Sequence, residues 1–489
     1  MKKPLILCEF VHAMGNGPGD IEDYMELMNA QDKFCGGFVW EWCDHATWEG
    51  KAADGRDIYH YGGDAGEFPH DSNFCMDGLV YPDRRPHTGL REWKNAIRPV
   101  RAQLENLSEG RILLRNMQDF SDLSDTVELR YEIKRDGQLL AEGRIGDLCA
   151  KPHETARIAL PELGKYAGDK TWLRLIYLQK QDGLLTVRGR EMGFDQFALF
   201  EETQRELQLS EAGSIKIEET EDSFWVVSDR IRYRFGKKTA GFVSLERDGK
   251  AMMDGPMRWS TWRAPTDNDR YIRKEWQDAG YDRPWTKVYS CSADAEGQIA
   301  RICCEFSLAG VYRQPFLSAK ALWEVNAEGA VKLTLDAEKD SIFPWMPRFG
   351  LTLTLPREYR SVSYLGYGPD ESYQDKHRAS WIDRFETSVD SLHEDYVRPQ
   401  ENGSHFHCYD VQVGPLRAEG RMPFSFNASY YTEQELTEKG HNYELEKSGH
   451  VIWHLDYGMS GVGSNSCGPV LLEKYRLDEE EIHWEMILC

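Results

Sequence analysis

Residues 4–40 read PLILCEFVHAMGNGPGDIEDYMELMNAQDKFCGGFVW, and this stretch decides the fold that we expect at the start of the chain. Pro4–Cys8 is a continuous apolar run of strand length, Asp20 is placed to cap a helix, and residues 38–40 form a second apolar run. Between the two runs, four apolar side chains share one helical face: Ile21, Tyr24, Met25 and Met28. A strand, a helix and a second strand in this order predict a βαβ unit with parallel strands.

The apolar pattern changes to period two from about residue 98 onward. Residues 127–145, VELRYEIKRDGQLLAEGRI, alternate on both sides of Asp136-Gly137, which predicts a β-hairpin. Residues 171–178 alternate too, and an acidic stretch follows near 201–211. Further strand-like segments lie at residues 224–235, 321–336, 349–356 and 451–459. This pattern predicts two antiparallel β-sandwiches, one immunoglobulin-like of about 100 residues and one much larger.

These changes divide the chain into three expected domains, at residues 1–97, 98–205 and 212–489. The fold class is therefore multidomain and mainly β. Two strands and one helix cannot cover both faces of a parallel sheet, so residues 1–97 are expected to be part of a larger α/β domain. On this interpretation the chain begins in the middle of a domain.

The charge of the chain restricts its partners. It has 489 residues, with 82 acidic against 59 basic side chains and a formal net charge of −23. Such a field repels phosphate backbones and anionic lipids, so neither nucleic acid nor a membrane surface is expected as the main partner. A neutral ligand such as a sugar is compatible with it.

The cysteines indicate the compartment. Eleven cysteines are scattered along the chain, only Cys303 and Cys304 are adjacent, and no CxxC motif occurs. This usage favours reduced thiols and a cytoplasmic protein. No apolar run reaches the roughly 18–20 residues of a membrane span.

Glu9 is the first candidate for a catalytic residue. It closes the first apolar run, His12 follows three residues later, and a glycine-rich turn comes next. This arrangement is typical of a catalytic carboxylate at the mouth of a strand. The alternative interpretations are an ion-paired strand-end glutamate, a structural histidine and, for Trp40 at the end of the second run, a core tryptophan.

Seven motifs, in order along the chain, resemble those of the large β-galactosidases of glycoside hydrolase family 2. They are PLILCEFVHAMGN, GGFVWEWCDH, YGGDAGEFPHDSNFCMDGLVYPDRRPH, WRAPTDND, LGYGPDESYQDK, RPQENGSHFHC and GVGSNSCGP. The resemblance covers essentially the whole chain, as the C-terminal portion of a longer protein. It implies the last two strands of a TIM barrel, then a β-sandwich, then a large C-terminal β-domain.

The resemblance also implies the reaction and its residues. Retaining glycosidases use one carboxylate as nucleophile and a second, about 5 Å away, as acid/base. Glu9 would be the nucleophile that forms a galactosyl-enzyme with a β-galactoside such as lactose. His12 would hydrogen-bond galactose hydroxyls, and Trp40 would offer its ring to the apolar face of the sugar.

Two further positions of the substrate site depart from the family pattern. The family places a sodium ion on the backbone carbonyl of Phe74 and on the side chain at position 77, where this chain has Asp77 instead of the asparagine of the best-known members. A carboxylate still suits a hard cation. Cys467 stands where some members place a tryptophan, so stacking on the aglycone would be weaker here.

The second carboxylate is missing from this sequence. The family's acid/base glutamate directly follows an asparagine upstream of the nucleophile, and no Asn-Glu dipeptide occurs in the chain. The magnesium ligands also lie upstream in the family. Three hypotheses follow: a fragment or truncated gene model of the enzyme, a natural subunit completed by another polypeptide, or a non-catalytic carbohydrate-binding or structural protein. Family members commonly form homo-oligomers, which an incomplete barrel would favour by exposing apolar surface.

Overall fold

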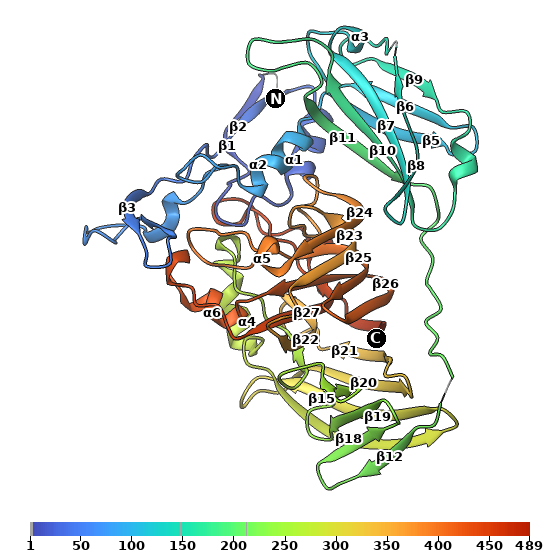
Figure 1. Cartoon of the computed structure of the whole chain (residues 1–489). Coiled ribbons are helices and arrows are strands. Elements are labelled where there is room, and N and C mark those ends of the chain that lie inside the picture. The colour runs from blue at the N-terminus through green and yellow to red at the C-terminus, as the bar shows by residue number, and fades with distance from the viewer. Residues whose placement is uncertain (1–2, 147, 212) are drawn as a thin grey trace.

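The computed structural model describes residues 3–146, 148–211 and 213–489. Figure 1 shows three regions: a small one at the N-terminus, a β region beside it, and a large β region that holds the C-terminus. The N-terminal region contains β1 Leu5–Phe10, α1 Ile21–Asn29, β2 Phe34–Val39, β3 Thr47–Lys51, β4 Asp57–His60, a 3₁₀ helix Ser72–Cys75 and α2 Thr88–Ala96.

The predicted βαβ unit is confirmed at the start of the chain. β1 and β2 pair in parallel, and α1 joins them. The apolar face of α1 packs on Phe10 through the four side chains expected, Ile21, Tyr24, Met25 and Met28. The capping role of Asp20 was wrong: its side chain makes no cap hydrogen bond, because Ser464 donates to it instead.

The second region is built from a three-stranded and a four-stranded antiparallel sheet. The strands of the first are β5 Val100–Asn106, β6 Arg111–Asn116 and β9 Thr155–Ala159. Those of the second are β7 Val127–Arg135, β8 Gln138–Ile145, β10 Thr171–Gln179 and β11 Glu191–Ala198, with α3 Leu123–Thr126 and a 3₁₀ helix Leu163–Tyr166 between strands. Asp136 and Gly137 both have positive φ and form the predicted hairpin turn between β7 and β8. One core joins the two sheets.

β10 is buried on both faces, although its sequence alternates. Leu173 and Leu175 point into the core of their own region. Trp172, on the other face, packs against Phe200 and against Tyr409 of the large region. The second face is therefore buried by contact with another region of the same chain.

The large region contains a five-stranded and a 12-stranded sheet among the described residues. The five strands are β12 Lys216–Glu219, β13 Ser223–Val227, β14 Ile231–Gly236, β15 Gly241–Arg247 and β16 Lys250–Ala251. The twelve are β17 Arg258–Ser260, β18 Trp285–Glu296, β19 Ile299–Ala309, β20 Pro315–Asn326, β21 Val331–Lys339, β22 Arg348–Pro356, β23 Ser361–Gly368, β24 Trp381–Ser388, β25 His405–Val413, β26 Leu416–Ser429, β27 His450–Met459 and β28 Glu481–Leu488. Short helices lie between them: α4 Ile272–Ala279, α5 Val389–Leu392, α6 Glu433–Glu438 and the 3₁₀ helices Asp267–Asp269, Asn442–Glu444 and Glu473–Tyr475.

A single large hydrophobic core connects these two sheets. Phe242 of the five-stranded sheet meets Trp323 of the larger one edge to face, with ring centroids 5.4 Å apart. Such aromatic pairs add stability beyond the area that they bury. The chain is thus mainly β, with large antiparallel sheets and few helices.

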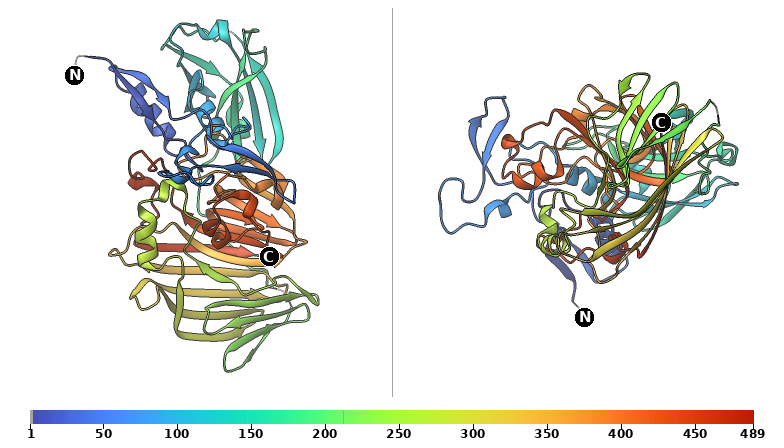
Figure 2. Two further views of the ribbon diagram at one scale, coloured as in Figure 1. Left: turned by 90° about the vertical axis from the view of Figure 1, so that its left-hand side faces the viewer. Right: turned by 90° about the horizontal axis from the view of Figure 1, so that it is seen from below.

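An extended segment connects the second region to the large one. Residues 201–210 have no regular secondary structure and run along the outside of the molecule, as Figure 1 shows. Figure 2 shows from two further sides that the N-terminal region lies against the end of the large region. Of the helices that the structure describes, none has the length and apolar composition required to span a membrane.

Candidate functional site

The turn Gly15–Asp20 fixes the N-terminal region to the large region. Asn16 is fully buried, and its side chain donates to the hydroxyl of Tyr373 at 2.9 Å and to the carbonyl of Glu401 at 2.7 Å. The side-chain oxygen Oδ1 of Asn16 accepts from Nζ of Lys376 at 2.7 Å. Every polar atom of this amide is therefore paired, which is what burial of an asparagine requires.

Glycine is required at the start of this turn. Gly15 has φ of +55°, and a Cβ at this position would lie 2.4 Å from Oδ2 of Asp267 and from the amide of Gln400. Gln400 in turn accepts from the backbone N–H of Asn16 at 3.0 Å. The motifs HAMGN, WRAPTDND and RPQENG are thus in contact, although the sequence separates them widely.

Two buried carboxyl groups lie at the end of the same turn. Asp375 accepts from the backbone N–H groups of Val462 and Gly463 at 2.9 and 2.7 Å. Burial, and then the nearby charge of Asp375, raise the pKa of Asp20 well above its usual value. Burial also raises the pKa of Asp375.

His12 follows β1 and is held from two sides. It is only 5% exposed, its Nδ1 lies 2.9 Å from Oγ of Ser466, and its Nε2 lies 3.4 Å from Oδ2 of Asp77. The ring of Phe74 packs near it, with centroids 5.5 Å apart. These contacts fix the plane of the imidazole ring.

Trp40 directly follows β2 and remains 39% exposed. Its indole N–H donates to Oδ2 of Asp77 at 2.9 Å. Asp77 is buried, and its backbone carbonyl accepts from the N–H of Glu41 at 2.8 Å. One carboxylate therefore positions both His12 and Trp40 while leaving an indole face open to solvent.

The structure brings four of the six predicted site residues into direct contact: His12, Trp40, Phe74 and Asp77. Glu9 is exposed near the carboxyl end of β1, one residue before Phe10, whose carbonyl accepts from the N–H of Trp40. Cys467 is exposed and comes directly after Ser466. Glu9 and Cys467 are therefore close to the cluster along the chain, but neither takes part in the contacts that join His12, Trp40, Phe74 and Asp77.

Glu41 adds a second carboxyl group to the cluster. Burial, and then the charge of Asp77, raise the pKa of Glu41. On its other side His45 lies 3.5 Å from Oε1 of Glu41. Two neighbouring carboxyl groups of this kind favour a proton or a cation between them.

Besides Glu41, sequence reasoning missed three further residues that contribute to the site. Ser466 contacts His12, and its backbone N–H donates to Oδ1 of Asn268 at 3.1 Å. The guanidinium of Arg270 lies 5.3 Å from the centroid of the Phe74 ring. Ser466 and Asn268 lie inside two of the quoted motifs, and Arg270 directly follows one, so the motifs were the available signal.

Among the described residues, no group of three or more His, Cys, Asp or Glu side chains is arranged to hold a metal ion. Oδ1 of Asp77 is buried and has no hydrogen-bond partner in the described part of the chain. A carboxylate oxygen left unpaired in this way fits a hard cation, which takes oxygen ligands.

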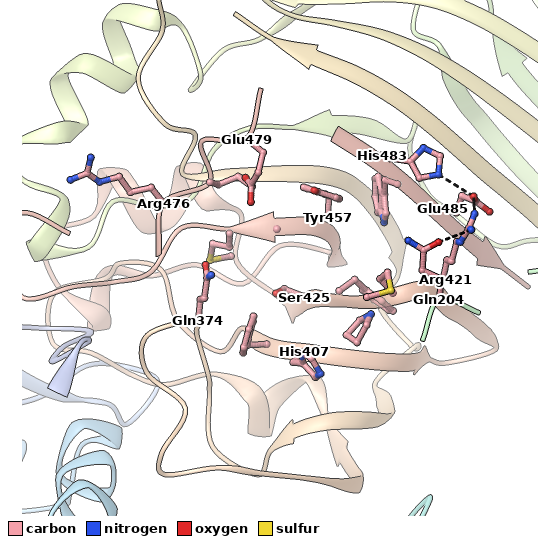
Figure 3. A pocket seen from close by; sticks show the side chains of 18 residues that line it. Gln204, Gln374, His407, Arg421, Ser425, Tyr457, Arg476, Glu479, His483 and Glu485 are labelled. Carbon is pink, nitrogen blue, oxygen red and sulfur yellow. Dashed lines mark hydrogen bonds and ion pairs between the residues drawn. The ribbon is translucent and has the colours of Figure 1, made fainter. Parts of the chain in front are cut away.

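A separate hollow of about 380 Å³ lies on the large region. Figure 3 shows that Arg421, His483 and Glu485 form a connected polar group on one side of it, with His407 nearby. None of the six predicted site residues lines this hollow. It is therefore distinct from the His12–Asp77 cluster.

His12 and Trp40 thus share one buried carboxylate, Asp77, beside a pair of parallel strands on a mainly β scaffold. Residues 227–488, more than half of the chain, match the family model for the β-galactosidase small chain. The chain therefore belongs to the β-galactosidases of glycosyl hydrolase family 2. Residues 1–102 match the TIM barrel domain of glycosyl hydrolases family 2, and residues 112–200 match β-galactosidase domain 4.

Curated relatives agree with the family models. A β-galactosidase from Actinobacillus pleuropneumoniae is 40% identical over 98% of this chain and 47% of its own length. A β-galactosidase from Staphylococcus xylosus is 36% identical over 100% of this chain and 49% of its own length. A β-galactosidase from Arthrobacter sp. (strain B7) is 30% identical over 98% of this chain and 49% of its own length. The chain thus spans about half the length of the curated relatives that it matches.

Solved structures give a weaker likeness. A galactose 1-epimerase from Lactobacillus acidophilus NCFM aligns with 57% of this chain and 98% of that chain, at 11% identity and a TM-score of 0.31.

Proposed function

We propose that this chain supplies the nucleophile half of a retaining β-galactosidase, with Glu9 as the nucleophile and the acid/base on polypeptide outside it. The observation that carries the proposal is the contact of Trp40 and His12 with one carboxylate, Asp77, directly beyond the strand that ends with Glu9 and Phe10. An exposed ring next to fixed polar groups is suited to a sugar, which has apolar faces and hydroxyl edges.

The proposal includes a larger fold for residues 1–97. β1 and β2 would be the last two strands of a (β/α)₈ barrel, because they are parallel neighbours joined by a helix. Catalytic groups of such barrels lie at the carboxyl ends of the strands, where Glu9 and Trp40 stand. The later regions would be an immunoglobulin-like β-sandwich and a large β-sandwich.

In the reaction, Glu9 would attack the anomeric carbon of a terminal β-galactose and form a galactosyl-enzyme, which water then hydrolyses. The acid/base would protonate the leaving oxygen, a step worth about 10²–10⁴-fold in rate. His12 would hydrogen-bond sugar hydroxyls, Trp40 would stack on the sugar, and Cys467 would border the aglycone position without the ring that some relatives have.

The proposal also includes two cations. The carbonyl of Phe74 and the carboxylate of Asp77 would hold a sodium ion, whose charge would attract sugar hydroxyl oxygens. The unpaired Oδ1 of Asp77 supports this assignment. Magnesium ligands would come from the upstream polypeptide. We further propose a cytoplasmic homo-oligomer whose partners are the galactoside and the polypeptide that completes the barrel.

The first test detects the nucleophile independently of the acid/base. The purified chain, alone and mixed with the part of the Actinobacillus relative that this chain does not match, is incubated with a 2-deoxy-2-fluoro-β-galactoside that carries dinitrophenolate as leaving group. This leaving group departs without protonation, so labelling requires only a positioned nucleophile. We expect a fluorogalactosyl group on the Glu9 peptide in the mixture, and none with Glu9→Gln.

Hydrolysis of a nitrophenyl β-galactoside is the second measurement. We expect no turnover by the chain alone and turnover in the mixture, abolished by Glu9→Gln. Turnover by the chain alone would place an acid within it, and Glu41→Gln would be the variant to examine. Absence of both labelling and turnover in the mixture would contradict the proposal and favour a non-catalytic carbohydrate-binding or structural subunit.

A further inference from the structure

Cys291 and Cys304 lie directly opposite each other on the neighbouring antiparallel strands β18 and β19. Opposite residues of an antiparallel pair have Cα atoms about 4.5 or 5.5 Å apart, depending on the type of pair. Disulfides usually join residues with Cα atoms about 4.4–6.8 Å apart. The register therefore places the two thiols within bonding range, on the face that packs against the large core.

The two thiols differ in access. Cys304 is 2% exposed and belongs to the core, whereas Cys291 is only partly buried. Cys291 also borders an open hollow of about 750 Å³. Cys304 does not line this hollow, so Cys291 is the more accessible of the two thiols.

The hollow is lined by basic side chains although the protein as a whole is acidic. Among the described residues that line it, four are basic and none is acidic: Lys237, Lys238, Arg283 and Lys287. Lys237 and Arg283 also pair with Glu219 and Asp282, which reduces part of this charge. Lys238 and Lys287 add to the positive field at the mouth of the hollow.

The thiols also differ in acidity. The pKa of Cys291 is lowered, mainly because the thiol of Cys304 donates a hydrogen bond to it. Burial acts in the opposite direction, and the positive charge of Lys237 lowers the pKa further. The same hydrogen bond, followed by burial, raises the pKa of Cys304. Cys291 is therefore the more acidic of the two thiols.

We propose that Cys291 and Cys304 are a thiol–disulfide redox pair, in which Cys291 is the attacking thiol and Cys304 the resolving thiol, and that its oxidant is an anionic low-molecular-weight disulfide such as glutathione disulfide. The pair is independent of the glycosidase function, because it lies in the β18–β19 hairpin of the large region. Oxidation would join the two strands of this hairpin covalently.

The steps balance. The Cys291 thiolate attacks one sulfur of glutathione disulfide, forms a mixed disulfide and releases one glutathione thiolate. That thiolate takes the proton of Cys304, whose sulfur then attacks Sγ of Cys291 and releases the second glutathione, which takes up the proton lost from Cys291. Two protein thiols are oxidised to one disulfide, and one glutathione disulfide is reduced to two glutathiones.

Cys303 provides a matched control in the same strand. It is exposed, lies opposite Ser292, and points to the other face of the sheet. Burial, and then the charge of Asp294, raise the pKa of Cys303. It should therefore react more slowly than Cys291, despite its greater exposure.

The experiment treats the folded chain with glutathione disulfide, blocks the remaining thiols by alkylation, and maps the peptides by mass spectrometry. We expect the Cys291 and Cys304 peptides to be linked, with the loss of two hydrogen atoms, in the parent and in Cys303→Ser. In Cys304→Ser, glutathione should stay on Cys291, added roughly tenfold faster than on Cys303 of the same chain. Cys291→Ser should leave Cys304 unreacted.

Cys304→Ala is a second variant that removes the resolving thiol, in case serine is not tolerated in the core. Melting curves equal to that of the parent show that the variants are folded. The exposed Cys149 reports that the oxidant is active. Modification of Cys149 without a Cys291–Cys304 link would overturn the proposal. So would equal rates at Cys291 and Cys303, or linkage that appears only after unfolding in urea.

Discussion

Nδ1 of His12 lies 2.9 Å from Oγ of Ser466, although 454 residues separate the two along the chain. Both side chains are buried. A histidine that follows the first strand is thus oriented by a loop that precedes the last one. The N-terminal and C-terminal regions therefore build the candidate site jointly.

Replacing Ser466 by alanine tests this relationship. The change removes the hydroxyl that fixes the imidazole while leaving the backbone N–H that contacts Asn268. A hydrogen bond of this kind contributes about 1 kcal/mol, so we expect kcat/KM of the completed enzyme for a galactoside to fall roughly five- to tenfold. Ser464→Ala is the matched control, because Ser464 bonds Asp20 instead of His12. Equal losses in both variants would contradict a role of Ser466 through His12.

Asp77 is expected to control the response to sodium. Asp77→Asn keeps an oxygen acceptor for the Trp40 indole but removes the charge, so the sodium concentration for half-maximal activity should rise about tenfold, as for a loss of about 1.4 kcal/mol. Asp77→Leu removes both functions and should also raise KM for the sugar, since Trp40 loses its hydrogen bond. Steady-state kinetics across a sodium titration, with potassium keeping the ionic strength constant, measures both effects. Identical titrations for Asp77→Asn and the parent would exclude Asp77 as a ligand.

The buried amide of Asn16 should be the main attachment of the N-terminal region. Asn16→Ala leaves the ammonium of Lys376 and the hydroxyl of Tyr373 without this partner inside the protein. Tyr373 and Lys376 keep Glu371 as a partner, so the expected loss is that of about one unsatisfied buried group, about 1–3 kcal/mol. We expect a lower melting temperature and faster proteolysis within residues 3–97. Asn29→Ala, at the exposed end of α1, should change neither.

Glu92 should make stability depend on pH. Burial raises the pKa of this carboxyl from 4.5 to about 7, and one of its oxygens accepts from the N–H of Ala379. The folded state therefore binds the proton of Glu92 more tightly than the unfolded state does. This adds stability that is complete below about pH 4.5 and is lost as the pH rises to about 7. Glu92→Gln keeps the acceptor without the charge.

Melting of Glu92→Gln and the parent between pH 4.5 and 8 measures this effect. The stability of the variant relative to the parent should increase by about 3 kcal/mol across this range, from 1.36 kcal/mol per pH unit. The exposed Glu246→Gln should show no such trend. A constant difference between Glu92→Gln and the parent would mean that Glu92 is ionised in the folded protein throughout.

The sequence predicted those parts of the fold that depend on local pattern. The parallel pair β1 and β2 follows from two apolar runs around a helical face, and the β7–β8 hairpin follows from Asp136-Gly137. The second buried face of β10 was not predictable, because Trp172 packs against Tyr409, which no local period connects to it. Asp20 illustrates the same limit, since Ser464 determines its role.

The candidate site shows a similar division. The family motifs pointed to His12, Trp40, Phe74 and Asp77, which the structure places in contact. Their roles in catalysis and sodium binding stay predictions. Ser466 and Glu41 were missed because their importance arises from neighbours brought close by folding, and neither residue type in isolation indicates it.

The joining of His12 to Ser466 has a consequence for synthesis of the protein on the ribosome. At about 5–20 residues per second, the loop that holds His12 emerges roughly 20 to 90 seconds after the histidine itself. During this interval the buried amide of Asn16 has not yet met Tyr373, Lys376 and Glu401, which are translated later. The turn that follows β1 thus reaches its native contacts only after most of the large region has been synthesised.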